Sequence, residues 1–233
     1  MIVTAHQPSY LPWIGYFNKI SQSQIYVFLD HVLPSKGDWL NRVKIKTSSG
    51  EQYLTVPIVK KNFLKSKISE LLIDNEKDWK SKHLSLIYSS YSKSKYFTNY
   101  FEKLEKIYSY KWKYIADLNY SLLNFFLEEL NIKVEILRSS KMNLLKKKSE
   151  LIVEICKKTS ATKFIFGEMG RNYANEDSFR ENNIKIYFQT FLSPKYDQLH
   201  GSFVPNLSTI DLLFNCGDKS KKIVKANSDY KHF

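Results

Sequence analysis

The stretch HQPSYLPWIGYFNK, residues 6–19, follows a short apolar segment, residues 1–5, that suits a buried strand. Each of its two prolines fixes φ near −65° and removes a backbone donor, so no helix can run through the first half of the stretch. Each proline also favours extended backbone in the residue before it, which is Gln7 in one case and Leu11 in the other. We therefore expect a stiff, irregular loop at the end of a strand, with Gly15 leading into a helix.

This opening loop carries the side chains of a binding pocket: an imidazole, an amide, phenols, an indole and an ammonium group. Loops that a rigid scaffold holds in place often carry the chemistry of a protein. The alternative is an N-terminal arm whose aromatic side chains only pack. The candidate residues of the loop are His6, Gln7, Tyr10, Trp13, Tyr16 and Lys19.

Length and composition suit a globular protein with a substantial core. The chain has 233 residues, of which 43% are hydrophobic and 15% aromatic. It contains no run of roughly 18 apolar residues for a membrane span and begins without the features of a secretory signal. The two cysteines, Cys156 and Cys216, lack close His or Cys neighbours, which argues against a disulfide framework and a zinc site. We expect a cytoplasmic protein without a metal.

The formal net charge of +13 is compatible with nucleic acid, an anionic membrane surface or an anionic substrate as partner. Only four of the 36 basic residues are arginine, the side chain that most often reads bases through paired hydrogen bonds. We therefore expect an anionic small molecule rather than nucleic acid.

The order of predicted elements indicates an α/β protein. Residues 24–32 and the segments 133–138, 163–166 and 184–188 read as strands, and helices are predicted between the last three. Further helices are expected at 16–23 and 207–215, and the Lys-rich tail after Gly217 is expected to be loosely held. The predicted fold is α/β with α+β elements: a central, mainly parallel sheet with flanking helices, an added β-hairpin and a helical insertion. We expect a single domain, residues 1–233, with a hairpin subdomain at 39–75 and the insertion at 77–131.

The hairpin subdomain pairs residues 39–46 with residues 51–59 across a Ser-Ser-Gly turn. Residues 68–73 are expected to add a third strand to it. Three cations alternate with apolar residues along the first strand, which suggests either a phosphate-binding face or an ordinary solvated face. Its candidate residues are Trp39, Asn41, Arg42, Lys44 and Lys46.

Ligands of open α/β sheets gather outside the carboxyl ends of the parallel strands. Three loops are expected to open there, at residues 6–15, 30–39 and 167–173. The third, within FGEMGRNY, has glycines for close backbone approach, but it matches no phosphate-binding fingerprint, and an ordinary strand-to-helix turn is an equal alternative. The last two loops contribute Asp30, Lys36, Gly167, Glu168, Gly170, Arg171 and Tyr173 as candidates.

Two histidines outside the opening loop have competing interpretations. His83 shares a helix face with Trp79 and Ile87, so we expect a core histidine. His31 could be a base oriented by Asp30, although neighbours in a strand point to opposite faces. Near the end of the chain, the polar segment 196–206 and the helix after it add Tyr196, His200, Asn206 and Asp211 as candidates.

Four segments together resemble the WbqC-like protein family: HQPSYLPWIGYFNKI, VFLDHV, WLNRVKIK followed by SGEQYLTVPI, and YDQLHGSFVPNLSTIDLLFNCG. The resemblance covers nearly the whole chain in order, and residues 100–165 carry little of it. Glu168 stands where small residues are common in the family. The resemblance implies a bacterial protein of O-antigen and other surface-polysaccharide gene clusters, where nucleotide-linked amino sugars are acylated or aminoacylated.

In that setting the expected function is transfer of an acyl or aminoacyl group to the amine of a nucleotide-linked amino sugar. His6 would accept the proton of the amine, Gln7 or Asn41 would donate to the oxyanion, and the cations of the hairpin would bind phosphate. The donor is not identified, no further cofactor is implied, and a homo-oligomer is possible. The alternative from another class is a non-catalytic module that binds sugar nucleotides or supports other assembly enzymes.

Overall fold

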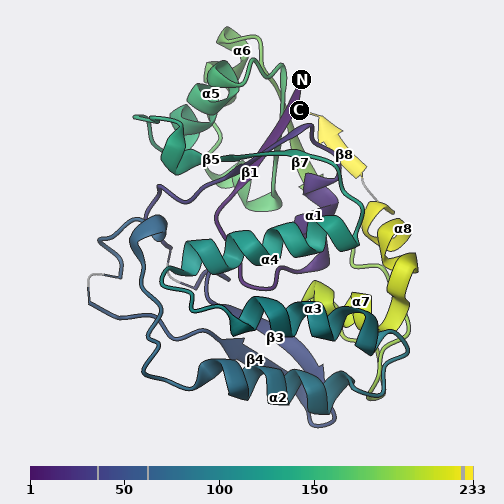
Figure 1. The fold of residues 1–233 in the computed structure, drawn as a ribbon. Helices are drawn as coiled ribbons and strands as arrows, with labels where there is room; N and C mark the ends of the chain where they lie inside the picture. The colour runs from purple at the N-terminus through teal and green to yellow at the C-terminus, as the bar shows by residue number, and fades with distance from the viewer. Residues whose placement is uncertain (36, 62, 227–228, 233) are drawn as a thin grey trace.

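A computed structural model describes residues 1–35, 37–61, 63–226 and 229–232 of the chain (Figure 1). Its main sheet has six strands in the order β5-β2-β1-β6-β7-β8. The five strands from β5 to β7 are parallel, and β8 pairs antiparallel with β7. The strands are β1 Ile2–His6, β2 Ile25–Phe28, β5 Glu135–Arg138, β6 Lys163–Phe166, β7 Lys185–Thr190 and β8 Asp229–His232. The predicted α/β class and mainly parallel sheet are confirmed.

Helices cover both faces of this sheet, and the alternation within β2 shows how. Tyr26 and Phe28 belong to the larger core on one face, and Ile25 and Val27 to the smaller core on the other. Figure 1 shows α5 and α6 on the smaller side, and α1, α4 and α3 on the opposite side. The helices are α1 Ile14–Ile20, α2 Trp79–Tyr91, α3 Phe97–Ser109, α4 Ile115–Glu129, α5 Lys148–Lys158, α6 Glu176–Glu181, α7 Thr209–Cys216 and α8 Ser220–Lys225.

A separate two-stranded hairpin, β3 Arg42–Thr47 and β4 Gly50–Thr55, packs beside α2. The expected third strand at residues 68–73 is wrong. Residues Ile68–Glu70 form the 3₁₀ helix η1, and Ile73 makes only an isolated bridge to Ile58. The backbone N–H groups of Ile68 and Ser69 donate to the carbonyls of Val32 and Asp30. This segment therefore holds the loop after β2 instead of extending the hairpin.

The tail after Gly217 is more ordered than expected. It forms the 3₁₀ helix η4, Gly217–Lys219, then α8 and β8. Val224 of α8 is fully buried, and the Asn18 amide of α1 donates to the Val224 carbonyl at 2.8 Å. The expectation of a loosely held tail rested on its lysines and did not take the burial of Val224 into account.

The opening loop between β1 and α1 is held by the start of α7. Ser208, the N-cap of α7, donates its hydroxyl to the Leu11 carbonyl at 2.8 Å, and the Thr209 N–H donates to the Pro12 carbonyl at 2.9 Å. Leu11 has φ +43°, so the extended conformation expected before proline is wrong. Such backbone costs about 1–3 kcal/mol and persists where surrounding contacts hold it. The buried Leu11 side chain and the bond from Ser208 are those contacts.

Candidate functional site

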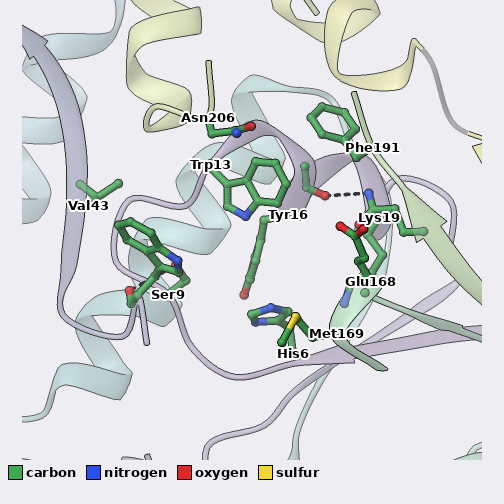
Figure 2. A pocket seen from close by; sticks show the side chains of 14 residues that line it. His6, Ser9, Trp13, Tyr16, Lys19, Val43, Glu168, Met169, Phe191 and Asn206 are labelled. Carbon is green, nitrogen blue, oxygen red and sulfur yellow. Dashed lines mark hydrogen bonds between the residues drawn. The ribbon is translucent and has the colours of Figure 1, made fainter. Parts of the chain in front are cut away.

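A pocket of about 400 Å³ opens at the carboxyl ends of the central strands (Figure 2). His6 ends β1, and Gly167 directly follows β6, the neighbour of β1 in the sheet. The chain passes from β1 to β2 on one side and returns to β6 on the other, so the pocket lies where strand order diverges, the usual ligand position in open α/β sheets. The lining residues are His6, Ser9, Trp13, Gly15, Tyr16, Lys19, Trp39, Val43, Gly167, Glu168, Met169, Gln189, Phe191 and Asn206.

The Trp13 indole forms one wall because α1 has a glycine in its first turn. A Cβ atom built on Gly15 would overlap the six-membered ring of Trp13. The indole therefore folds back over the helix and packs edge-on against Phe191, with ring centroids 5.4 Å apart. The sequence W-I-G-Y thus encodes a fixed position for one aromatic wall.

His6 presents a neutral imidazole to the pocket. Its Nδ1 lies 2.8 Å from the Gln7 carbonyl, so we assign the proton to Nδ1 and leave the Nε2 lone pair as an acceptor. Burial and the nearby positive charge of Lys19 lower the pKa of His6 from 6.5 to about 3. The ring keeps solvent-exposed surface within the recess, so water moderates this shift. Its direction still keeps the ring neutral at pH 7.

Lys19 projects from α1 beneath the turn after β6. The residue is only 2% exposed, and its ammonium donates to the Ala5 carbonyl at 3.1 Å. Burial lowers the pKa of Lys19 from 10.5 to about 7. Within the described residues no carboxylate oxygen lies within 4 Å of the ammonium. A buried lysine whose pKa is lowered toward neutral pH therefore lies near the imidazole.

The remaining walls combine apolar surface with a few polar groups. Trp39 and Met169 are 44% and 72% exposed, and they border the pocket from the hairpin side and from η3, the 3₁₀ helix Glu168–Asn172. The Glu168 carboxylate lies on the same side of the pocket as Lys19 (Figure 2). Gln189 is buried, and its amide donates to the Gly15 carbonyl at 2.9 Å. The pocket therefore offers a ligand aromatic faces, the neutral His6 acceptor, and the Lys19 amine and the Glu168 carboxylate as two separate groups.

The structure brings part of the predicted site together here. The predicted residues that line the pocket come from four stretches of the sequence: His6, Trp13, Tyr16, Lys19, Trp39, Gly167, Glu168 and Asn206. The other predicted residues that the structure describes lie outside the lining set. Lys36 falls outside the described residues.

Two predicted residues near the start of the chain join internal networks instead. The Tyr10 hydroxyl is bonded to Tyr108 and lies 2.8 Å from Nδ1 of His83, which is buried as expected for a core histidine. Asp30 is fully buried and accepts from Arg138 at 2.7 Å and from the Ser140 N–H at 2.8 Å. Both networks tie elements of the core together.

Asp30 and His31 share one partner, the Ser139 hydroxyl, although neighbours in a strand would point to opposite faces. Strand β2 ends at Phe28, so both residues lie in the loop after it. The Ser139 hydroxyl donates to Asp30 at 3.1 Å and lies 2.7 Å from Nδ1 of His31. Ser139 is only 1% exposed, so this contact is part of the interior.

The cations of the hairpin form contacts within the protein. Lys44 pairs with Glu51 at 2.5 Å. The buried Lys46 ammonium donates to the Ser202 carbonyl at 2.6 Å, which anchors the loop before α7. Arg42 lies beside Trp39, with its guanidinium carbon 5.8 Å from the indole centroid. Among the three cations, Arg42 is thus the one that reaches a residue of the pocket.

Some residues of the turn after β6 line the pocket, and the others pack against the sheet. A Cβ atom on Gly170 would come within 2.6 Å of Phe166, so this glycine permits close packing of η3 on β6. Arg171 places its guanidinium 4.5 Å from the Phe188 ring centroid, and Tyr173 meets the Phe166 ring edge-on at 5.9 Å. These contacts fix η3 and thereby the position of Glu168.

The predicted residues near the end of the chain build a buried polar cluster. Asp211 accepts from the Tyr91 hydroxyl at 2.9 Å and from the Tyr196 hydroxyl at 2.8 Å. Burial raises the pKa of Asp211, although the bonds from both tyrosines oppose the rise. The His200 ring donates from Nε2 to the Ser90 carbonyl at 2.7 Å. The cluster joins α7 to α2 and to the preceding loop.

The two amides predicted as oxyanion donors are not in the lining set. Asn41 donates its amide to the Val56 carbonyl at 2.8 Å. The Gln7 side-chain oxygen is buried, and none of the residues that the structure describes gives it a hydrogen bond. Neither amide borders the cavity beside His6.

Sequence reasoning missed Ser9, Gly15, Val43, Met169, Gln189 and Phe191 as lining residues. Gln189 and Phe191 lie at the carboxyl end of β7, and the rule that ligands bind at this edge was a usable signal for them. The predicted strand ended at residue 188, so these two residues were not recognised as lying at its carboxyl end. For Val43 no signal existed, because its contact depends on how the hairpin packs.

Two common features are absent from the described residues. No group of three or more His, Cys, Asp or Glu side chains there is arranged to hold a metal ion. None of the helices in the same residues is long and apolar enough to cross a membrane.

Comparison with known proteins identifies one family. The model of the WbqC-like protein family matches residues 7–223. The chain is 35% identical over 213 residues to the uncharacterized protein Rv1507c of Mycobacterium tuberculosis, covering 91% of this chain and 92% of that protein. No solved structure matches. Because the family model spans the pocket loops, the hairpin and α7 alike, the chain belongs to the WbqC-like protein family.

Proposed function

We propose that this protein transfers an acyl or aminoacyl group to the amine of a nucleotide-linked amino sugar during synthesis of bacterial surface polysaccharide, including O-antigen. The observation that carries the proposal is the neutral His6 imidazole in an aromatic pocket at the strand switch point. Trp13, Trp39 and Phe191 offer faces and edges on which a sugar ring or a nucleobase can pack. A nucleotide-linked sugar carries negatively charged phosphate groups, which a chain of net charge +13 attracts.

In the proposed reaction the sugar amine attacks the carbonyl carbon of the donor. A C–N bond forms, and the bond from the carbonyl carbon to the leaving group breaks with its electron pair on the leaving group. His6 Nε2 accepts the proton of the attacking amine and returns it to the leaving group. Gln7 and Asn41 have no part in this reaction, because neither borders the pocket.

Mass spectrometry tests this proposal directly. Purified protein is incubated with nucleotide-linked amino sugars and a panel of acyl and aminoacyl donors, and the sugar product is weighed. We expect a mass gain equal to the transferred group, and a loss of about 10²–10⁴-fold in turnover in His6→Ala. His31→Ala is the matched control, because His31 lies outside the pocket and should leave turnover unchanged.

Two results would contradict the proposal at different points. Turnover of His6→Ala within about threefold of the unmodified protein would remove the base role. A thermal shift with sugar nucleotides but no mass gain with any donor would instead support the non-catalytic binding module.

A further inference from the structure

Lys19 is a buried cation with few partners. An ammonium group has three donors, and the Lys19 ammonium has one bond, to the Ala5 carbonyl at 3.1 Å, in the described part of the chain. The residue is 2% exposed, and all seven residues of α1 are buried. A buried charge without a counter-ion is costly, so proteins pair such groups or bind an opposite charge at them.

The side of Lys19 that faces the pocket is bordered by a residue without a side chain. A Cβ atom on Gly167 would lie 3.9 Å from the Lys19 ammonium, and no other heavy atom lies within 4 Å of that position apart from its chain neighbours. The absence of a side chain here leaves room beside the ammonium at the end of β6. Lys19 itself belongs to the pocket lining.

We propose that the ligand of this pocket carries a phosphate or carboxylate group, and that this anionic group binds at the Lys19 ammonium. This inference rests on the proposed function for the place where the ligand binds and adds the charge of the group that binds there. It requires no transfer reaction, so it can hold if the proposed function fails.

The charges around Lys19 are those that an anion would meet. His6 of β1 is neutral, and Tyr16 and Tyr26, whose pKa values are raised by burial, are neutral as well. Glu168 of η3 is the acidic group that faces the same pocket (Figure 2). Helix α8, which packs against α1, contributes only basic charged residues, Lys221, Lys222 and Lys225. An incoming anion therefore competes with Glu168 alone among these groups.

Proton uptake follows from this arrangement. Burial holds the pKa of Lys19 near 7, so the amine is mostly neutral at pH 8. A bound anion favours the charged form, raises this pKa and draws a proton from solution. Binding should therefore weaken as pH rises through 7. The positive charge of Lys19 is one of the two causes that lower the pKa of His6. A bound anion offsets this charge and so strengthens the imidazole as a base.

The test measures proton uptake by the full chain in weakly buffered solution with a pH indicator. The probes are uridine diphosphate for the phosphate, acetate for the carboxylate and uridine as an uncharged control. At pH 8, where both anions are fully ionised, we expect at least one of them to bind with net proton uptake, and we expect Lys19 to take up less at pH 6, where its amine already carries the proton. Uridine should cause none. The probe that shows uptake identifies which anionic group the site takes.

Four variants separate Lys19 from other sources of protons. Lys19→Met should take up no proton and should bind the anion at least tenfold more weakly. Lys19→Arg, which stays charged, should bind the anion without proton uptake. Glu168→Gln should bind as tightly or more tightly, because it removes the competing carboxylate. Lys157→Met, in the last turn of α5 on the other face of the sheet, is the matched control and should behave like the unmodified protein.

The proposal is overturned if neither anion binds, if binding at pH 8 takes up no proton, or if Lys19→Met retains the uptake. Should Lys19→Met fail to fold by circular dichroism, the unmodified protein and Lys19→Arg still decide the question. Uptake without any sugar product in the mass-spectrometry assay would sustain this inference while the proposed transfer failed.

Discussion

At the scale of single residues, Gly15 matters because it makes room for a side chain two positions earlier. The Trp13 indole occupies the space that a Cβ atom on Gly15 would need, and both residues line the pocket. Glycine in a helix costs roughly 1 kcal/mol relative to alanine. Its presence in the first turn of α1 is therefore explained by the position of the indole.

We expect Gly15→Ala to displace the Trp13 ring while leaving the fold intact. Ligand affinity should fall about tenfold, as expected for loss of one aromatic contact of 1–1.5 kcal/mol. The measurement is tryptophan fluorescence, read as the difference from Trp13→Phe, together with binding of uridine diphosphate. Unchanged emission and unchanged affinity would show that the indole does not need the glycine.

At the scale of elements, the opening loop and α7 depend on each other. Ser208 caps α7, donates its hydroxyl to the Leu11 carbonyl and forms a backbone bridge with Trp13. Two segments almost 200 positions apart in the sequence therefore act as one support for the pocket.

Ser208→Ala should loosen this support. Loss of the cap and of the bond to Leu11 should lower the free energy of unfolding by about 1–2 kcal/mol. Amide hydrogen exchange of residues 9–16 should speed up, since Leu11 would lose a contact that holds its φ of +43°. Ser89→Ala is the control, because that exposed hydroxyl bonds only within α2. Faster exchange confined to α7 would contradict the coupling.

The elements themselves were predictable to different degrees. The strand at Lys163–Phe166 matched its prediction because a short β-branched and aromatic run between turn signals is a strong signal. The apolar run at residues 68–73 carried a similar signal but became η1, because its backbone donates to the loop after β2. The left-handed Leu11 was not predictable either, since its cause lies in α7. Local pattern cannot reveal a distant partner.

At the scale of the whole molecule, strand order decides which candidates form a site. The sequence predicts three loops at one edge of the sheet, but it contains no direct sign that β1 lies between β2 and β6. That order places the first and third loops together at the pocket, whereas Trp39 is the residue of the second loop, among those the structure describes, that lines it. Asp30 and Asp211 carry carboxylates, as Glu168 of the pocket does, yet both accept hydrogen bonds from partners inside the protein. Residue type alone could not separate the two groups.

The most direct test of the central claim, that the pocket between β1 and β6 is the ligand site, is a crystal structure with a uridine diphosphate-linked amino sugar. We predict that the sugar lies among Trp13, Trp39 and Phe191, with its amine within hydrogen-bond reach of His6 Nε2. A ligand bound elsewhere, for example on the outer face of the hairpin at Arg42 and Lys44, with the pocket free of ligand, would contradict the account.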